Sequence, residues 1–177
     1  MKNLLEENFD LARKNDGMGQ KALYEMFSDK MLAIANSYTN NIYDAEDLLV
    51  TSFYTCFKKI NECRDPKSFP FWLRKIVVNN CVDFIRKNKN LMYLDIDVNN
   101  INIEDEENSW EDNAYSINLE DIFSKMPDGY RLIFNLSVFE EKKHQEIAAI
   151  LNISEGTSKS QLSKAKKWII DYIKSEK

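Results

Sequence analysis

The chain has 177 residues, 44% of them hydrophobic and 30% charged, so it can bury one medium core or two small ones and is not a wholly disordered protein. The chain has only 4 glycines and 3 prolines, the residues that form the tight turns between strands, and this argues against an all-β fold. No apolar run reaches the roughly 18 residues that span a bilayer, and the N-terminus becomes acidic before a signal-peptide core could form. We therefore expect a cytoplasmic protein without membrane contact.

The net charge of −5 is distributed unevenly along the chain. Residues 1–90 carry 14 Lys and Arg against 12 Asp and Glu, and residues 122–177 carry 10 against 7. Residues 91–121 carry 10 acidic and no basic residues, are rich in Asn and Asp, and lack helical periodicity. The pattern predicts two mildly basic domains, 1–90 and 122–177, joined by an acidic linker, 91–121.

Both basic blocks show helical periodicity, so we expect an all-α protein with two small helical domains. The first block begins with a short helix from Leu4 to about Lys14 and a second helix from about Gln20 to Tyr38. Asp44 is the expected N-cap of a third helix. The inward face of this third helix is expected to carry Ala45, Leu49, Ser52, Phe53, Cys56 and Ile60, and its outward face Asp47, Val50, Thr51, Tyr54 and Lys58. An outward-facing Val and Tyr beside charges favour a docking surface.

A fourth helix is predicted from about Phe69 to Asn88, after a loop that contains Asp65-Pro66. Its core stripe is Leu73, Ile76, Val77, Asn80, Cys81 and Phe84. The other face combines aromatic, amide and basic side chains: Phe71, Lys75, Val78, Asn79, Val82 and Arg86, flanked by Trp72 and followed by Lys87 and Lys89. Single-stranded DNA binding uses such a mixture, because rings stack on bases and cations bind phosphates. A solvated basic face is the alternative.

The C-terminal block begins with helices over Leu119–Met126 and Gly129–Val138 and then has the pattern of a helix-turn-helix starting at His144. Asn152 stands at the turn, and Ser154 would cap the second helix. The inward face of that helix is expected to hold Ser158, Leu162, Ala165 and Ile169. The outward face is expected to hold Gly156, Ser160, Ser163, Lys164 and Lys167, with Thr157 and Lys159 at the flanks. Small, hydroxyl and ammonium groups there favour binding in the major groove of DNA.

The cysteines, Cys56, Cys63 and Cys81, form neither a CxxC pair nor a disulfide framework, so we expect buried or half-buried thiols. Their spacing to His144 matches no zinc module. A Ser-His-Asp triad stays open as an alternative, although no sequence neighbour of His144 is expected to orient its ring. We predict no metal, no cofactor and no enzyme activity.

Three motifs resemble one family, the extracytoplasmic-function sigma factors of bacterial RNA polymerase. Tyr43-Asp-Ala-Glu-Asp-Leu-Leu resembles the segment that docks on the clamp of the β′ subunit. The pattern from Phe69 through Trp72 to Asn79, followed by Asp83-Phe-Ile-Arg86-Lys, resembles the helix that melts and reads the −10 element. The pattern from Glu146 to Lys166 resembles the helix-turn-helix that reads the −35 element, and its sequence is similar to versions from Bacteroidota.

The resemblance implies a sigma factor that binds core RNA polymerase, at the β′ clamp and the β subunit, and directs promoter recognition and strand opening. Its DNA would be promoter duplex and the non-template single strand. Polymerase docking would use Asp44, Asp47, Val50, Thr51 and Tyr54. Contacts to the −10 element would use Trp72, Lys75, Asn79, Arg86 and Lys87. Contacts to the −35 element would use Thr157, Lys159, Ser160, Ser163, Lys164 and Lys167.

Asn79 and the loop 61–68 would hold a base flipped out of the non-template strand. An anti-sigma factor or another recruiting protein is a further implied partner, with the apolar side chains Val50, Tyr54, Phe71 and Val82 as candidate contacts. The free protein is expected to be a monomer, because no exposed heptad stripe remains.

The docking motif departs from the family at one point, because Val50 and Thr51 stand where Gln and an acidic residue are usual. The loss of two polar contacts, at about 1 kcal/mol for a neutral hydrogen bond, would weaken polymerase binding about tenfold or more. Two alternative functions therefore stay open. One is a sigma-fold adaptor that another DNA-targeting protein recruits, and the other is a free-standing helix-turn-helix regulator.

Overall fold

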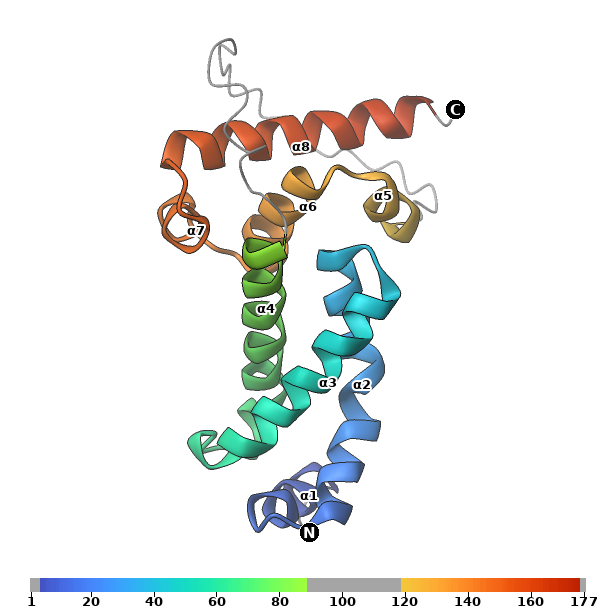
Figure 1. The fold of residues 1–177 in the computed structure, drawn as a ribbon, viewed down its shortest axis with the longest axis vertical. Coiled ribbons are helices and arrows are strands. Elements are labelled where there is room, and N and C mark those ends of the chain that lie inside the picture. The colour runs from blue at the N-terminus through green and yellow to red at the C-terminus, as the bar shows by residue number, and fades with distance from the viewer. Residues whose placement is uncertain (1–3, 89–118, 176–177) are drawn as a thin grey trace. The chain divides into compact units, whose positions relative to one another are not determined.

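The computed structural model describes residues 4–88 and 119–175, and every regular element in these ranges is helical (Figure 1). Contacts divide the chain into two compact units with the boundary after Asn88. The first unit contains α1 (Leu4–Arg13), α2 (Gly17–Thr39), α3 (Ile42–Lys59), the 3-10 turns η1 (Ile60–Glu62) and η2 (Pro66–Ser68), and α4 (Phe69–Asn88). The second unit contains α5 (Leu119–Lys125), α6 (Asp128–Phe134), a π-helical turn η4 (Asn135–Phe139), α7 (His144–Leu151) and α8 (Glu155–Ser175). The predicted all-α class is confirmed for the described residues.

The predicted acidic linker, 91–121, lies mostly outside the described residues. Its last three residues, 119–121, belong to α5. The helix predicted over Gly129–Val138 is divided in the structure, because α6 gives way to the π-helical turn η4 at Asn135. No described helix is both long enough and apolar enough to cross a bilayer.

Asparagine residues lie at the turns between consecutive helices of the first unit. Asn15 and Asn40 take left-handed backbone conformations, with φ of 61° and 54°, which Asn tolerates better than most residues. The Asn41 side chain then accepts hydrogen bonds from the Tyr43 and Asp44 amides at 2.9 and 3.4 Å. The N-cap of α3 is thus Asn41, and the prediction of Asp44 as N-cap is wrong. Asp44 lies in the first turn, where its charge still favours the positive end of the helix dipole.

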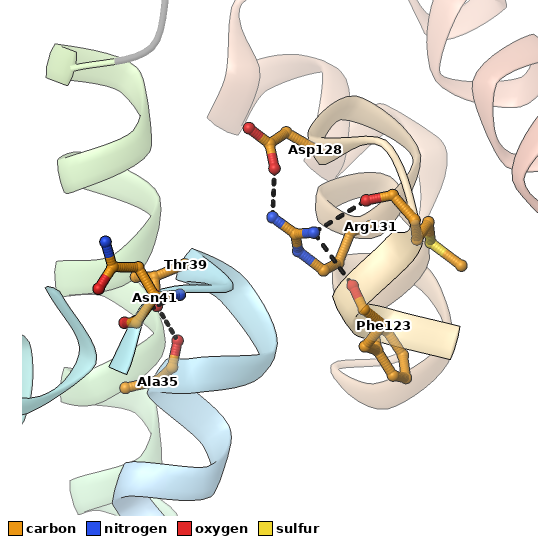
Figure 2. Close-up of polar contacts among 7 residues, drawn as sticks. Ala35, Thr39, Asn41, Phe123, Asp128 and Arg131 are labelled. Atoms are coloured by element: carbon orange, nitrogen blue, oxygen red, sulfur yellow. Dashed lines mark hydrogen bonds and ion pairs between the residues drawn. The ribbon is translucent and has the colours of Figure 1, made fainter. Parts of the chain in front are cut away.

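Thr39 closes the corner between α2 and α3 from inside. Its buried hydroxyl lies 3.2 Å from the Ala35 carbonyl oxygen and 3.0 Å from the Asn41 carbonyl oxygen (Figure 2). These two acceptors lie on either side of the left-handed residue Asn40. The hydroxyl therefore ties the end of α2 to the start of α3.

The core of the first unit is centred on Phe69, the first residue of α4. Its ring is fully buried, and its centroid lies 5.5 Å from that of Phe9 on α1 and 5.6 Å from that of Phe27 on α2. The crossing of α1 and α2 requires a glycine. A Cβ at Gly19 would lie 2.5 Å from the Leu11 Cβ and 2.7 Å from the Ala12 nitrogen, so α1 packs directly on the backbone of α2.

A polar bridge joins α3 to α4 inside this core. Ser52 is fully buried, donates to the Leu48 carbonyl at 2.6 Å, and accepts a hydrogen bond from the Asn80 amide at 2.9 Å. The bridge satisfies the one polar residue on the inward face of α3. It also explains why an asparagine stands in the core stripe of α4.

The three cysteines are all buried thiols, as predicted. Burial raises the pKa of both Cys56 and Cys81 to about 12. Burial also raises the pKa of Cys63, which lies between η1 and η2 in the loop that precedes α4.

The second unit is organised around a buried arginine. Arg131 on α6 is 1% exposed, and its guanidinium donates to the carbonyls of Phe123 at 3.1 Å and Met126 at 2.9 Å (Figure 2). It also pairs with Asp128, which lies one turn earlier on the same helix. The guanidinium thereby binds the last turn of α5, whose carbonyls have no partner within their own helix. This contact fixes the angle between α5 and α6.

The long helix α8 closes this unit over α5 and α6. Ile122, Met126 and Ile169 form its small core, with Trp168 and Tyr172 packed against it. The rings of Trp168 and Tyr172 are stacked, with centroids 5.2 Å apart.

A charged contact also joins α5 to α8 at the edge of this core. The Tyr172 hydroxyl donates to Asp121 at 2.6 Å, and the Lys125 ammonium donates to the same hydroxyl at 2.6 Å. The hydroxyl and the ammonium both hold the pKa of Asp121 below its usual range.

Candidate functional site

The outward face of α3 presents an apolar stripe between charges. Val50 and Tyr54 are each 62% exposed, and Tyr43 near the start of the helix is 75% exposed. Asp47 and Thr51 lie on the same side and are exposed, whereas Asp44 is half-buried. All inward-facing residues predicted for this helix are buried, so the predicted helical phase is confirmed. We call Asp44, Asp47, Val50, Thr51 and Tyr54 the α3 surface.

Aromatic packing holds the α3 surface in place from behind. Phe53 is buried between the rings of Tyr24 and Phe57, at centroid distances of 4.7 and 5.8 Å. At the far end, the Lys58 ammonium lies 5.0 Å from the centroid of the Tyr54 ring. The surface is therefore presented on a rigid helix, with a cation over its last ring.

The exposed face of α4 carries the predicted mixture of cations and amide. Lys75, Asn79, Arg86 and Lys87 are exposed. Arg86 makes only a long surface ion pair with Asp83, at 3.7 Å, which contributes little to stability. Trp72 is half-buried, and its ring packs on Phe69 at 6.2 Å. We call Trp72, Lys75, Asn79, Arg86 and Lys87 the α4 surface.

Two valines predicted on this face are part of the core instead. Val78 and Val82 are 6% and 5% exposed. The inward stripe of α4 is wider than predicted because the helix packs against both α2 and α3. Val82 is therefore excluded as a contact for a partner protein.

The loop before α4 is more ordered than a plain connection. It folds into η1 and η2, and Asp65 caps the second turn by accepting from the Lys67 amide at 3.0 Å. Ser68 donates to the Asp65 carbonyl at 2.9 Å, and Arg13 on α1 donates to the Asn61 side chain at 3.2 Å. Because hydrogen bonds hold both ends of the loop, the loop forms an ordered rim beside the start of α4.

The helix-turn-helix has the predicted turn geometry. Asn152 ends α7 with a left-handed φ of 56°, and its N–H bonds back into that helix. Ser154 then caps α8, since its hydroxyl accepts from the Thr157 amide at 2.9 Å. At the other end, Glu146 accepts from the Lys143 amide at 2.9 Å, which fixes the first turn of α7.

The start of α8 carries the residues predicted to meet the −35 element. Lys159, Ser163 and Lys167 are exposed, and Ser160 and Lys164 are half-buried. Thr157 differs, because it is buried and its hydroxyl lies 2.8 Å from that of Ser154. A direct contact of Thr157 with DNA does not fit this placement. We call Lys159, Ser160, Ser163, Lys164 and Lys167 the α8 surface.

An acidic residue lies beside the α8 surface. The Glu155 carboxylate is 2.9 Å from the Lys159 ammonium, one turn further along the helix. This hydrogen bond holds the pKa of Glu155 below its usual value. In the free protein, Lys159 is therefore partly neutralised.

His144 is oriented by a partner that sequence spacing did not reveal. Its Nδ1 lies 2.9 Å from the Ser158 hydroxyl, which belongs to α8, so the contact bridges the two helices of the helix-turn-helix. Burial and the nearby cation Lys159 hold the pKa of His144 below its ordinary value. The orienting partner is 14 residues further along the chain, so no sequence neighbour of His144 supplies it.

A metal site is not indicated in the described part of the chain. Across residues 4–88 and 119–175, no three His, Cys, Asp or Glu side chains gather in a way that could hold a metal ion.

One structural feature could not be predicted from sequence. Nothing in the sequence around Arg131 predicts its burial, and only the Asp128 at i−3 indicates a pairing partner. Phe71, 76% exposed at the start of α4, fits its predicted place on the mixed face and among the candidate contacts for a partner protein, although it is not among the residues predicted to meet DNA.

Comparison with known proteins identifies both units. Residues 23–91 match the family described as Sigma-70 region 2, and residues 116–169 match the one described as Sigma-70, region 4. The RNA polymerase sigma factor SigV of Bacillus subtilis is 31% identical over 134 residues, which cover 76% of this chain and 78% of that protein. The ECF RNA polymerase sigma factor SigW of the same organism is 26% identical over 177 residues, which cover 94% of this chain and 95% of SigW.

Two solved structures share the fold. CnrH, in complex with the cytosolic domain of CnrY, has a TM-score of 0.51 at 15% identity and covers 96% of this chain and 97% of its own. The sigma factor RpoE of Bartonella quintana, in complex with the anti-sigma factor NepR, has a TM-score of 0.50 at 19% identity, over 89% of this chain and 98% of its own. The chain belongs to the extracytoplasmic-function sigma factors, and it directs the initiation of transcription.

Proposed function

We propose that the two units of this sigma factor have different functions, in agreement with the side chains that each unit exposes. Residues 1–90 act as region 2, which docks on the polymerase and opens the −10 element, and residues 122–177 act as region 4, which reads the −35 element. Residues 91–121 are the acidic connection. The factor has no catalytic activity of its own and works in the cytoplasm, as a monomer when free.

The observation that carries this proposal is the segregation of chemistry on α4. One face packs into the core through Phe69, Leu73 and Val77, and the other presents Lys75 and Asn79 to solvent. Ammonium groups bind phosphates without regard to sequence, whereas an amide can donate to and accept from a base edge. The exposed ammonium and amide groups of α4 therefore suit a single DNA strand whose bases turn toward the protein.

We propose that the α3 surface docks on the β′ clamp. Val50 and Tyr54 are apolar and exposed on a rigid helix, and burying such side chains stabilises an interface. Because Val50 and Thr51 replace polar family residues, the interface would be more apolar than in typical relatives. CnrH and RpoE are each bound to a partner protein in their solved structures, and a recruiting or anti-sigma protein of this chain would compete for the exposed side chains Val50, Tyr54 and Phe71.

We propose that the α8 surface reads the −35 element. Lys159, Lys164 and Lys167 would bind phosphates, and Ser160 and Ser163 would reach base edges. Thr157 would act indirectly, because its buried hydroxyl packs against the Ser154 cap. The helix N-terminus, capped by Ser154, would add a favourable field for a phosphate.

The test is a pull-down of core RNA polymerase with the full chain, followed by transcription from a promoter library with and without it. Binding, together with start sites that share −35 and −10 sequences, supports the proposal. Binding without any shared promoter sequence favours a recruited adaptor. Retention of duplex DNA in the absence of polymerase favours a free-standing regulator.

Matched variants separate the surfaces. Val50→Asp should weaken the pull-down at least tenfold, and Met18→Asp should not, because Met18 is equally apolar and 81% exposed but lies outside the α3 surface. Asn79→Ala should impair strand opening and leave polymerase binding intact. An unchanged pull-down with Val50→Asp would contradict docking through α3.

A further inference from the structure

The last turn of α1 reaches the loop between α3 and α4. The Nε of Arg13 donates a hydrogen bond to the side-chain oxygen of Asn61 at 3.2 Å, although the two residues are 48 positions apart in the chain. The guanidinium also lies over the ring of Phe9, 5.8 Å from its centroid, and this contact favours the direction in which the side chain extends. Arg13 thereby joins η1, the first half of the loop, to a helix outside it.

The helix that carries Arg13 is itself fixed in place. A Cβ at Gly19 would lie 2.7 Å from the nitrogen of Ala12, so the end of α1 packs directly on the backbone of α2. The ring of Phe9 packs edge to face on Phe69, the first residue of α4, with centroids 5.5 Å apart. Because α1 also contacts both η1 and η2, it holds a fixed position relative to the loop and to the helix that follows it.

The two halves of the loop are held in different ways. The second half, η2, is held from within, because the Asp65 side chain caps it. In the first half, the Cys63 amide donates to the Ile60 carbonyl at 3.1 Å, and both of these residues are buried. Asn61 lies between them with its side chain exposed. The hydrogen bond from Arg13 therefore holds the outer side of a turn whose inner side is held by burial.

We infer that Arg13 is a positioning residue for promoter opening, because through Asn61 it fixes the shape of the loop 61–68, which is expected to hold a flipped base. A base that leaves its strand loses pairing and stacking, and contacts with the protein must replace them. A loop that already has its binding shape avoids the cost of ordering when the base arrives. The match to Sigma-70 region 2 begins at residue 23 and does not include α1. The inference rests on the proposed opening of the −10 element by the first unit.

Two replacements of Arg13 separate its hydrogen bond from its charge. The side-chain nitrogen of glutamine is as many bonds from the backbone as the arginine Nε, so Arg13→Gln keeps a donor there and removes the charge. Methionine has a methyl group at that place, so Arg13→Met removes both. Lys14→Met is the control, because Lys14 is the next residue and is also basic and exposed. Since the Arg13–Asn61 bond lies at the surface, these variants should fold.

The experiment uses holoenzyme assembled from core polymerase and the full chain, on a promoter recovered from the library selection. The template is mismatched across the −10 element, so that its strands are already open. An abasic site is then moved along the open non-template strand, one nucleotide at a time. Each position at which the abasic site weakens binding by the unchanged holoenzyme marks a nucleotide whose base the protein holds.

Arg13→Met should bind the intact open template about 3- to 10-fold more weakly than the unchanged protein, as expected for the loss of one hydrogen bond. At one of the marked positions, the abasic template should be bound equally by both proteins, because the base that the loop positions is missing. Arg13→Gln should stay within about twofold of the unchanged protein on the intact template. Arg13→Met should cause no further loss in an Asn61→Ala background. Lys14→Met should change binding of the intact and abasic templates by the same factor, and polymerase binding should be the same for all variants.

Unchanged binding of the intact template by Arg13→Met would overturn the inference. An equal loss on the intact template and on every abasic template would do the same, because a merely destabilised unit weakens all of them alike. A loss for Arg13→Gln as large as that for Arg13→Met would assign the effect to charge and also contradict positioning through the hydrogen bond. If no abasic site weakens binding by the unchanged holoenzyme, the proposed role of the first unit in strand opening fails, and the inference fails with it.

Discussion

Replacement of Arg131 by methionine tests the internal organisation of the second unit. Methionine keeps an unbranched apolar stem of similar length, whereas the guanidinium is lost. The carbonyls of Phe123 and Met126 then lose their donors at 3.1 and 2.9 Å, and Asp128 loses its ion pair with the guanidinium. Because Arg131 is 1% exposed, water cannot simply take its place.

The cost follows from these contacts. A buried acceptor left without a donor costs about 1–3 kcal/mol, and two such carbonyls are involved. Asp128 is half in solvent, so it regains water and contributes little. Relief of the buried charge opposes the loss, because burial lowers the pKa of Arg131 and so disfavours its charged form. We expect a net loss of about 2–4 kcal/mol in the free energy of unfolding of the second unit.

The assay is urea unfolding of the full chain in a Trp72→Phe, Trp110→Phe background. Trp168, one of 3 tryptophans, then reports on the second unit alone. Lys142→Met is the control within the same unit, because the Lys142 side chain makes only a long surface ion pair with Glu146, at 3.8 Å, and it should shift the midpoint little. A shift for Arg131→Met no larger than that of the control would refute the role assigned to the buried guanidinium.

Further predictions concern packing, protonation and DNA affinity. Gly19→Ala should destabilise the first unit by about 1–3 kcal/mol in urea unfolding, because the added Cβ meets backbone of α1. Gly17→Ala, where a Cβ meets nothing within 4 Å, should not, and equal effects would contradict the close crossing. The second unit should lose stability as the pH falls below the ordinary His144 pKa of 6.5, because burial lowers that pKa and the unfolded chain binds the proton more readily. His144→Asn should flatten this pH dependence, and an unchanged slope of stability against pH would show that His144 is not its source. Glu155→Gln should free Lys159, tighten −35 binding several-fold and steepen its salt dependence by up to about 1 in the log–log slope. Weaker binding of Glu155→Gln would instead indicate that the carboxylate contacts a base.

The helices of the first unit were predictable because their burial is periodic. On α3 every predicted inward residue is buried and Val50 and Tyr54 are exposed. The pattern failed on α4, where Val78 and Val82 are buried although they were expected on the exposed face. Both helices pack against two others, so periodicity gives the centre of a buried face, whereas its width depends on how the neighbouring helices lie against it.

Contacts between distant residues could not be predicted from local pattern. The cap of α3 was assigned to Asp44, yet Asn41 has the extended backbone that a capping residue needs. Arg131 and His144 carry no signal of burial in sequence, because their partners are carbonyls of α5 and a hydroxyl of α8. The burial and the partners of such residues can be predicted only when the packing of the helices is known.

The buried thiols have a practical consequence for labelling. A thiol reacts as its thiolate, so Cys56 and Cys81, with pKa values of about 12 and no access to solvent, should be inert toward maleimides at neutral pH. Cys63 is 3% exposed and burial raises its pKa as well, so a cysteine introduced at an exposed site such as Met18 would be modified selectively, with the native cysteines left in place. Fluorescent reporters could follow each unit through promoter opening in an otherwise unaltered chain.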